Sequence, residues 1–192
     1  MILIFDTETT GLPQNYNAPL TDFNNWPRVV QIAWQLHEPS GKLVSQGNRI
    51  VRPDGFSIPY NAEKVHGIST DRALREGLPL SDVMAEFLAD VAKATIISGH
   101  NIEFDLNITG CELLRLGQDN VLPAKKIIDT KEVSTDFCAL PGGKGGRFNP
   151  AARAAPTGKN ADVVAVLLVS SARQMMMNKI EQTTAGAGSE AA

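Results

Sequence analysis

Two carboxylates near the start of the chain have the spacing of a metal site. Asp6 and Glu8 directly follow the apolar run 1–5 and precede a turn at Gly11. The short, Ile-rich run predicts a buried strand, on which side chains two positions apart project to the same face. Carboxylates so close repel each other unless a cation lies between them, and Mg²⁺ prefers carboxylate oxygens. The alternative is a capping residue beside a solvated strand end.

A second stretch, 96–105, could complete such a site. It predicts a buried strand that leads into a helix, with Asp105 in the first helical turn. Asp105 is a candidate third ligand, although an acid there can also simply complement the helix dipole. Asn101 could hydrogen-bond to the strand end or to a substrate, and we expect His100 to be a structural donor.

Composition limits the class of protein. The chain has 192 residues, of which 43% are hydrophobic and 20% charged, enough for one domain with a substantial core. The formal net charge of −3 gives no global basic field, so a nucleic acid would need a local patch or metal ions. We expect Cys111 and Cys138 to be buried thiols in a reducing cytoplasm, and we expect neither a signal peptide nor a membrane span.

Hydrophobic periodicity predicts an α/β fold with a mixed sheet. Alternation over 28–36 predicts a half-buried strand, and 43–51 predicts a third strand, so the first three strands should form an antiparallel meander. Ser69 and Ser81 are the expected caps of two helices. The remaining predicted elements are helices at 58–67, 70–76, 103–116 and 130–140, and strands at 95–98 and 126–128.

The last quarter of the chain has a different composition. Segment 142–160 is glycine-rich and carries basic residues but no acid, which predicts a flexible loop that could contact phosphates or simply be solvated. Segment 161–180 predicts a final helix, although its apolar run 163–169 could instead be a buried strand. We expect 1–180 to form a single domain and 181–192 a disordered tail.

The two carboxylate stretches resemble a known family. Phe5–Leu12 and His100–Asp105 are similar to the first two motifs of the DEDD exonuclease superfamily, and most similar to the proofreading epsilon subunits of bacterial DNA polymerase III. Val65–Ser69 and Ile128–Thr130 resemble further segments of these proteins, so the resemblance covers about residues 1–140. It implies a ribonuclease H-like fold, a five-stranded mixed sheet flanked by helices, and metal-dependent 3′→5′ hydrolysis of nucleic acid.

The third motif of that family, His-x-x-x-x-Asp, is incomplete here. Asp162 matches the acid, but Thr157 stands where the family has its general-base histidine. The tyrosine variant of the motif is not met either, because residue 158 is Gly158. A positioned general base typically contributes ~10²–10⁴-fold to a rate, so its loss would slow cleavage severely without abolishing binding.

The resemblance assigns roles to residues. Asp6 would bridge two divalent ions, Mg²⁺ or Mn²⁺, with Glu8 and Asp162 on one ion and Asp105 on the other. The implied partners are the single-stranded 3′ end of DNA, with RNA left open, and a polymerase subunit; no membrane is implied. The candidate substrate-binding residues are Thr7, Thr9, Leu12, His66, Asn101 and Phe104.

Three functions compete at this point. The first is an active, proofreading-type 3′→5′ exonuclease. The second is a catalytically impaired member that binds nucleic acid ends or a polymerase partner, which the Thr157 departure favours. The third is a phosphatase of the haloacid dehalogenase type, whose D-x-D-x-T motif resembles Asp6–Thr9 except for Glu8 in place of the second Asp.

Overall fold

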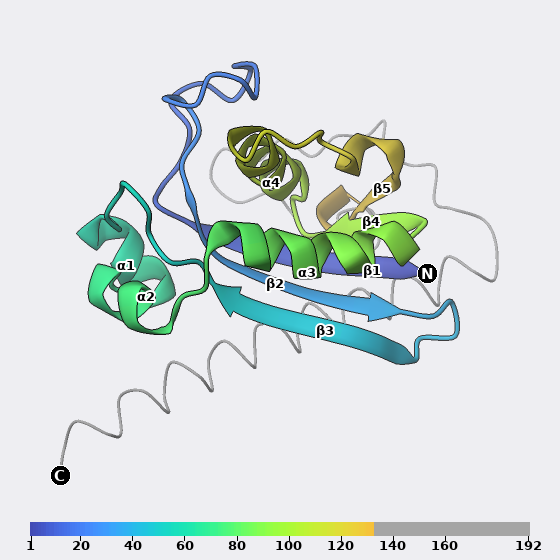
Figure 1. The fold of residues 1–192 in the computed structure, drawn as a ribbon. Coiled ribbons are helices and arrows are strands. Elements are labelled where there is room, and N and C mark those ends of the chain that lie inside the picture. Colours follow the sequence, from blue (N-terminus) through green and yellow to red (C-terminus); the bar gives the residue numbers. More distant parts are fainter. Residues whose placement is uncertain (133–192) are drawn as a thin grey trace, which may run out of the picture.

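The computed structural model describes residues 1–132, which form a five-stranded mixed sheet flanked by helices (Figure 1). The strand order is β3-β2-β1-β4-β5, with β1, β2 and β3 antiparallel and β4 and β5 parallel to β1. This confirms the predicted meander and mixed sheet. The strands are β1 (Ile2–Thr9), β2 (Val29–His37), β3 (Leu43–Ile50), β4 (Ile96–Gly99) and β5 (Lys126–Asp129). The helices are α1 (Tyr60–His66), α2 (Thr70–Glu76), α3 (Leu80–Lys93), α4 (Glu103–Arg115) and the short 3₁₀ turn η1 (Leu122–Ala124).

Alternation along β1 separates its two faces. Leu3 and Phe5 join the main core, in which α3 and α4 cover one face of the sheet. Ile2 and Ile4 pack on the other face in a smaller cluster. Because side chains alternate along a strand, Asp6 and Glu8 continue the row of Ile2 and Ile4.

Strand β2 corrects one prediction. Expected to be half-buried, it is buried at all nine positions. Its polar side chains can be buried because two of its amides have hydrogen-bond partners on β3 and do not depend on water. Gln31 Nε2 donates to Asn48 Oδ1 at 2.7 Å, and Gln35 Nε2 to Gln46 Oε1 at 3.4 Å.

Of the two predicted helix caps, one is confirmed and one is wrong. The Ser69 hydroxyl accepts from the N–H of Arg72 at the start of α2. Ser81, however, lies inside α3, which follows Pro79. The helix has no side-chain cap, and its first intrahelical hydrogen bonds run from residues 82 and 83 to the Pro79 carbonyl.

Several predictions concern residues beyond the described range. The helix expected at 130–140 begins at Thr130 and is described only as far as residue 132. The loop at 142–160, the element at 161–180, the tail and Cys138 lie outside. Within residues 1–132, no helix combines the length and the apolar character needed to cross a membrane.

A buried carboxylate fastens α3 to the sheet. Asp90 accepts hydrogen bonds from Trp34 Nε1 at 2.9 Å, Ser45 Oγ at 2.6 Å and Lys93 Nζ at 2.9 Å. Burial raises the pKa of Asp90, but the hydrogen bonds from Lys93, Ser45 and Trp34 outweigh it and leave the pKa below its usual value. The contact therefore stabilises the charged form and joins α3 to β2 and β3.

We predict that Asp90→Ala lowers the free energy of unfolding by about 2 kcal/mol or more, because the buried Trp34 N–H loses its acceptor. Glu86→Ala on the same helix should cost less than about 1 kcal/mol, because the Glu86–Arg49 ion pair is exposed. Urea unfolding monitored by tryptophan fluorescence measures both. Equal losses in the two variants would contradict the assigned role of Asp90.

Candidate active site

The first pair of carboxylates lies where β1 leaves the core. Asp6 and Glu8 are half-buried, whereas Thr7 and Thr9 between and after them are buried. Opposite them on β2 lie Ala33 and Gln31, so the row contains no basic side chain from that strand. Strand β1 runs through both acids, and because side chains alternate along a strand, Asp6 and Glu8 share one face as predicted.

Asp105 joins this strand end from α4. Its Oδ1 accepts two hydrogen bonds from Thr7, one from the backbone N–H at 2.8 Å and one from the hydroxyl at 2.6 Å. Strand β1 pairs with β4 only over Ile2–Ile4, so the Thr7 N–H lies beyond that ladder. The Asp105 carboxylate therefore takes the place of a neighbouring strand at this edge.

The pKa of the Asp105 carboxyl is affected both by burial and by the charge of Asp6. The Asp105 side chain is only 4% exposed. Burial, followed by the negative charge of Asp6, raises the pKa of Asp105 to about 7, although the two hydrogen bonds from Thr7 work against the rise. At neutral pH the Asp105 carboxyl is thus partly protonated, because a second negative charge beside that of Asp6 is unfavourable. A bound cation would relieve this repulsion.

The loop between β4 and α4 is held by the end of β5. Asn101 has a φ of 59°, the left-handed region that non-glycine residues seldom adopt. Its N–H donates to Asp129 Oδ1 at 2.9 Å, and its Oδ1 accepts from Lys131 Nζ at 2.9 Å. His100 Nδ1 lies 3.3 Å from the Thr130 hydroxyl, in agreement with the structural role expected for it. These contacts fix the backbone that starts α4 and therefore the position of Asp105.

The other predicted substrate-binding residues have different surroundings. The Thr9 hydroxyl donates to the Gly11 carbonyl at 2.6 Å and so shapes the turn after β1. Leu12 follows and is 73% exposed. His66 Nδ1 accepts from the Ile68 N–H at 3.1 Å, while Phe104 is partly buried against the core. Leu12 thus has the free surface that contact with a substrate needs, and the other three have local structural contacts.

A divalent cation fits this site in its donor chemistry. Asp6 and Asp105 supply carboxylate oxygens, and their mutual repulsion would be relieved by a positive charge. Among residues 1–132, however, no three His, Cys, Asp or Glu side chains come together as a metal-binding group. Asp162, the fourth predicted ligand, lies outside the described residues.

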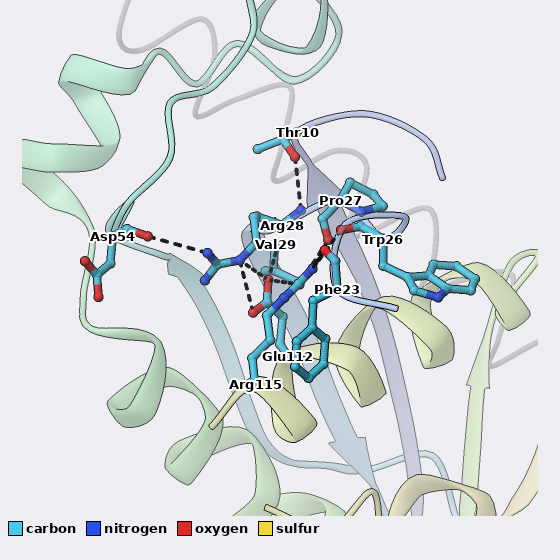
Figure 2. A network of polar contacts seen from close by, with 9 residues as sticks. All are labelled: Thr10, Phe23, Trp26, Pro27, Arg28, Val29, Asp54, Glu112 and Arg115. Carbon is cyan, nitrogen blue, oxygen red and sulfur yellow. Dashed lines mark hydrogen bonds and ion pairs between the residues drawn. The ribbon is translucent and has the colours of Figure 1, made fainter. Parts of the chain in front are cut away.

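A network of polar contacts next to the site was not predicted from the sequence (Figure 2). Glu112 of α4 is fully buried and forms ion pairs with Arg28 and Arg115. The contacts of Asp129 and Lys131 with Asn101 were likewise not predicted. The available signal for Glu112 was a second charged residue, seven positions after Asp105, on the face of the predicted helix that also carries Ile108.

We predict that Asp105→Asn stabilises the metal-free protein at high pH. The pKa of Asp105 is raised from 3.8 to about 7, so between these values the folded state binds a proton that the unfolded state does not. The wild-type free energy of unfolding should therefore fall as pH rises from 4 to 7. At roughly 1.4 kcal/mol per pKa unit, we expect the variant to gain about 2 kcal/mol or more above pH 8 and to lose this advantage near pH 4.

Thermal unfolding in the presence of a chelator, from pH 4 to 8, tests this prediction. Asp119→Asn is the matched control, because Asp119 is an exposed carboxylate. A stability of Asp105→Asn that follows the wild type at every pH would contradict the unfavourable charge assigned to Asp105. Added Mg²⁺ should stabilise the wild type more than the variant.

Curated relatives carry matching segments within much longer chains. DNA polymerase III PolC-type of Streptococcus sanguinis is 27% identical over 136 residues, which are 70% of this chain and 8% of the relative. The 3′-5′ exonuclease DinG of Bacillus subtilis is 30% identical over 132 residues, 69% of this chain and 13% of the relative. The chain thus spans about a tenth of the length of these relatives.

Solved structures of Escherichia coli exonuclease I share the fold. Its complex with a dA16 oligonucleotide matches with a TM-score of 0.61 and 18% identity, over 91% of this chain and 40% of that chain. The zinc-bound form with single-stranded DNA gives a TM-score of 0.59 at 16% identity, over 94% and 42%. At this identity the likeness confirms the ribonuclease H-like fold and no more.

The match to a protein family covers both carboxylate stretches. The profile of the RNase_T family, described as exonuclease, matches residues 3–145, which include Asp6, Glu8 and Asp105. This range is most of the chain and contains the contact of Asp105 with Thr7. On these grounds the chain belongs to the RNase_T family of exonucleases.

Proposed function

We propose that this chain is a divalent-metal-dependent exonuclease that removes nucleotides from the 3′ end of single-stranded DNA. The observation that carries the proposal is the Asp105 carboxylate, held by Thr7 beside Asp6 at the end of β1. Membership of the exonuclease family supports the reaction class. The same membership leaves no ground for the phosphatase interpretation of Asp6–Thr9.

The residues of the chain would share the reaction as follows. Asp6, Glu8, Asp105 and Asp162 would hold two divalent cations, Mg²⁺ or Mn²⁺, which supply charge neutralisation at the scissile phosphodiester and activation of water. Thr7 orients Asp105 through two hydrogen bonds and favours the ionised form that can act as a ligand. Leu12 would contact the terminal base, and its exposed side chain supports this role.

The names of the relatives support a polymerase partner and a single-stranded DNA substrate for this chain. One relative is a DNA polymerase III of the PolC type, which supports a proofreading role beside a polymerase. Exonuclease I was solved with single-stranded DNA, which supports a single-stranded DNA end as substrate in preference to RNA. The buried, free Cys111, whose thiol pKa is raised by burial, fits a reducing cytoplasm.

We predict that Asp6→Ala abolishes both cleavage and metal-dependent stabilisation. The substrate is a 5′-labelled single-stranded DNA oligomer with Mg²⁺ or Mn²⁺, and the wild type should shorten it from the 3′ end. Glu86→Gln, an exposed carboxylate on α3, is the matched control and should cleave like the wild type. Thermal unfolding with and without Mg²⁺ reports metal binding independently of cleavage.

Digestion of the oligomer by Asp6→Ala at the wild-type rate would overturn the site assignment. A DNA ladder that shortens from the 5′ end would overturn the direction of hydrolysis. A wild type that binds metal and DNA but leaves the oligomer intact would favour the second candidate function below.

The second candidate is a family member that binds nucleic acid ends or a polymerase without efficient cleavage. Thr157 favours it, because it stands five residues before Asp162, where the family has a histidine. We predict that Thr157→His raises the rate by about 10²-fold or more, since a positioned general base contributes that much. Single-turnover digestion measures the gain, with Thr157→Asn as a control that lacks a base of suitable pKa.

A further inference from the structure

Glu112 is a fully buried carboxylate with a complete set of partners (Figure 2). Arg28 Nε donates to its two oxygens at 2.9 and 3.3 Å, and Arg115 Nη1 lies 3.1 Å from Oε1. The backbone N–H of Val29 donates to the same Oε1 at 3.0 Å. A buried charge needs compensation of this kind, so every contact of Glu112 constrains the elements that supply it.

These partners come from the segments that flank the candidate site. Arg28 and Val29 lie at the start of β2, and the Arg28 backbone exchanges hydrogen bonds with Thr10, just after β1. Arg115 Nη2 donates to the carbonyls of Phe23 at 2.8 Å and Trp26 at 2.7 Å. The second half of α4 is thus fastened to the loop that joins β1 to β2.

Helix α4 is consequently attached at two points, one on β1 and one at the residue that follows it. Asp105 contacts Thr7, and Glu112, seven residues or about two turns further on, reaches Thr10 through Arg28. Residues at this spacing lie on the same face of a helix. Asp6 lies just before the first point and Glu8 lies between the two. A helix held at one point can pivot, whereas one held at two points keeps Asp105 in place relative to both acids.

A purely stabilising role would not require these residues. Buried ion pairs are seldom better for stability than well-packed apolar side chains of similar volume. Asp90 on α3 is likewise a buried carboxylate with several hydrogen-bond donors. Its described partners, Trp34, Ser45 and Lys93, lie on β2, β3 and α3, away from the residues that carry the site carboxylates. Asp90 therefore serves as a comparison for the structural effect alone.

We propose that Glu112 is a positioning residue of the exonuclease site: through Arg28 and Thr10 it fixes α4 against the end of β1 and so sets Asp105 beside Asp6. This inference rests on the proposed function for its catalytic consequence. The position of Asp105 itself can be measured without catalysis, because the Thr7 N–H donates to Asp105 Oδ1 and its exchange with solvent reports that contact.

The test compares Glu112→Gln with Asp90→Asn in the full 192-residue chain. Thr7 amide exchange is followed by NMR, and kcat and KM are measured on a 5′-labelled single-stranded DNA oligomer with Mg²⁺. For Glu112→Gln we expect faster Thr7 exchange and a kcat lowered about 10-fold or more, with KM little changed, because small misplacements of reacting groups are costly. Asp90→Asn should leave Thr7 exchange and kcat near wild type, despite its lower melting temperature.

A second variant covers the case in which Glu112→Gln does not fold. Thr10→Val removes only the acceptor of the Arg28 N–H at a half-buried position, and it should change Thr7 exchange and kcat in the same direction by a smaller factor. Unchanged Thr7 exchange in every folded variant would overturn the inference. Equal effects of Asp90→Asn and Glu112→Gln, at equal loss of melting temperature, would also overturn it. If the wild type does not cleave, the proposed function fails, and Thr7 exchange still decides the role of Glu112.

Discussion

The site depends on the place where β4 stops pairing with β1. The parallel ladder covers only Ile2–Ile4, although β1 continues to Thr9. A buried backbone N–H without an acceptor is costly, so the edge of β1 needs another partner beyond that point. Asp105 supplies it for Thr7 and is thereby brought beside Asp6. The requirement that a sheet edge be satisfied therefore also assembles the carboxylates.

In this arrangement the hydrogen bonds from Thr7 do not compensate the negative charge of Asp105. The hydrogen bonds from Thr7 favour the ionised form of Asp105, yet burial and the charge of Asp6 together prevail and raise its pKa. The buried carboxylates of Asp90 and Glu112 each contact basic side chains, from Lys93 in one case and from two arginines in the other. The described hydrogen bonds to Asp105 from other residues come from Thr7. The described contacts thus orient Asp105 without neutralising it, which agrees with the proposal that a cation binds there.

Features that depend on local pattern could be predicted from the sequence. Alternation places Asp6 and Glu8 on one face of β1, and Ser69 caps α2 because capping needs only the adjacent turn. Features that depend on distant residues were not predictable in this way. The amides of β2 are buried because β3 supplies partners for them, and the contact of Asp105 with Thr7 joins residues 98 positions apart. The family resemblance supplied Asp105 as a ligand, but not the bonds that orient it.

Glu112 shows where such reasoning can be extended. It shares the buried stripe of α4 with Asp105 and Ile108, and a charge on that stripe indicates a compensating partner elsewhere, without identifying it. In the structure these partners are Arg28 and Arg115, whose ion pairs hold the Glu112 carboxylate in place. Asp105, by contrast, accepts hydrogen bonds from the neutral donors of Thr7 and experiences the negative charge of Asp6. The neighbours of each carboxylate, more than the residue type or the helix position, therefore decide whether it holds the fold together or remains available for chemistry.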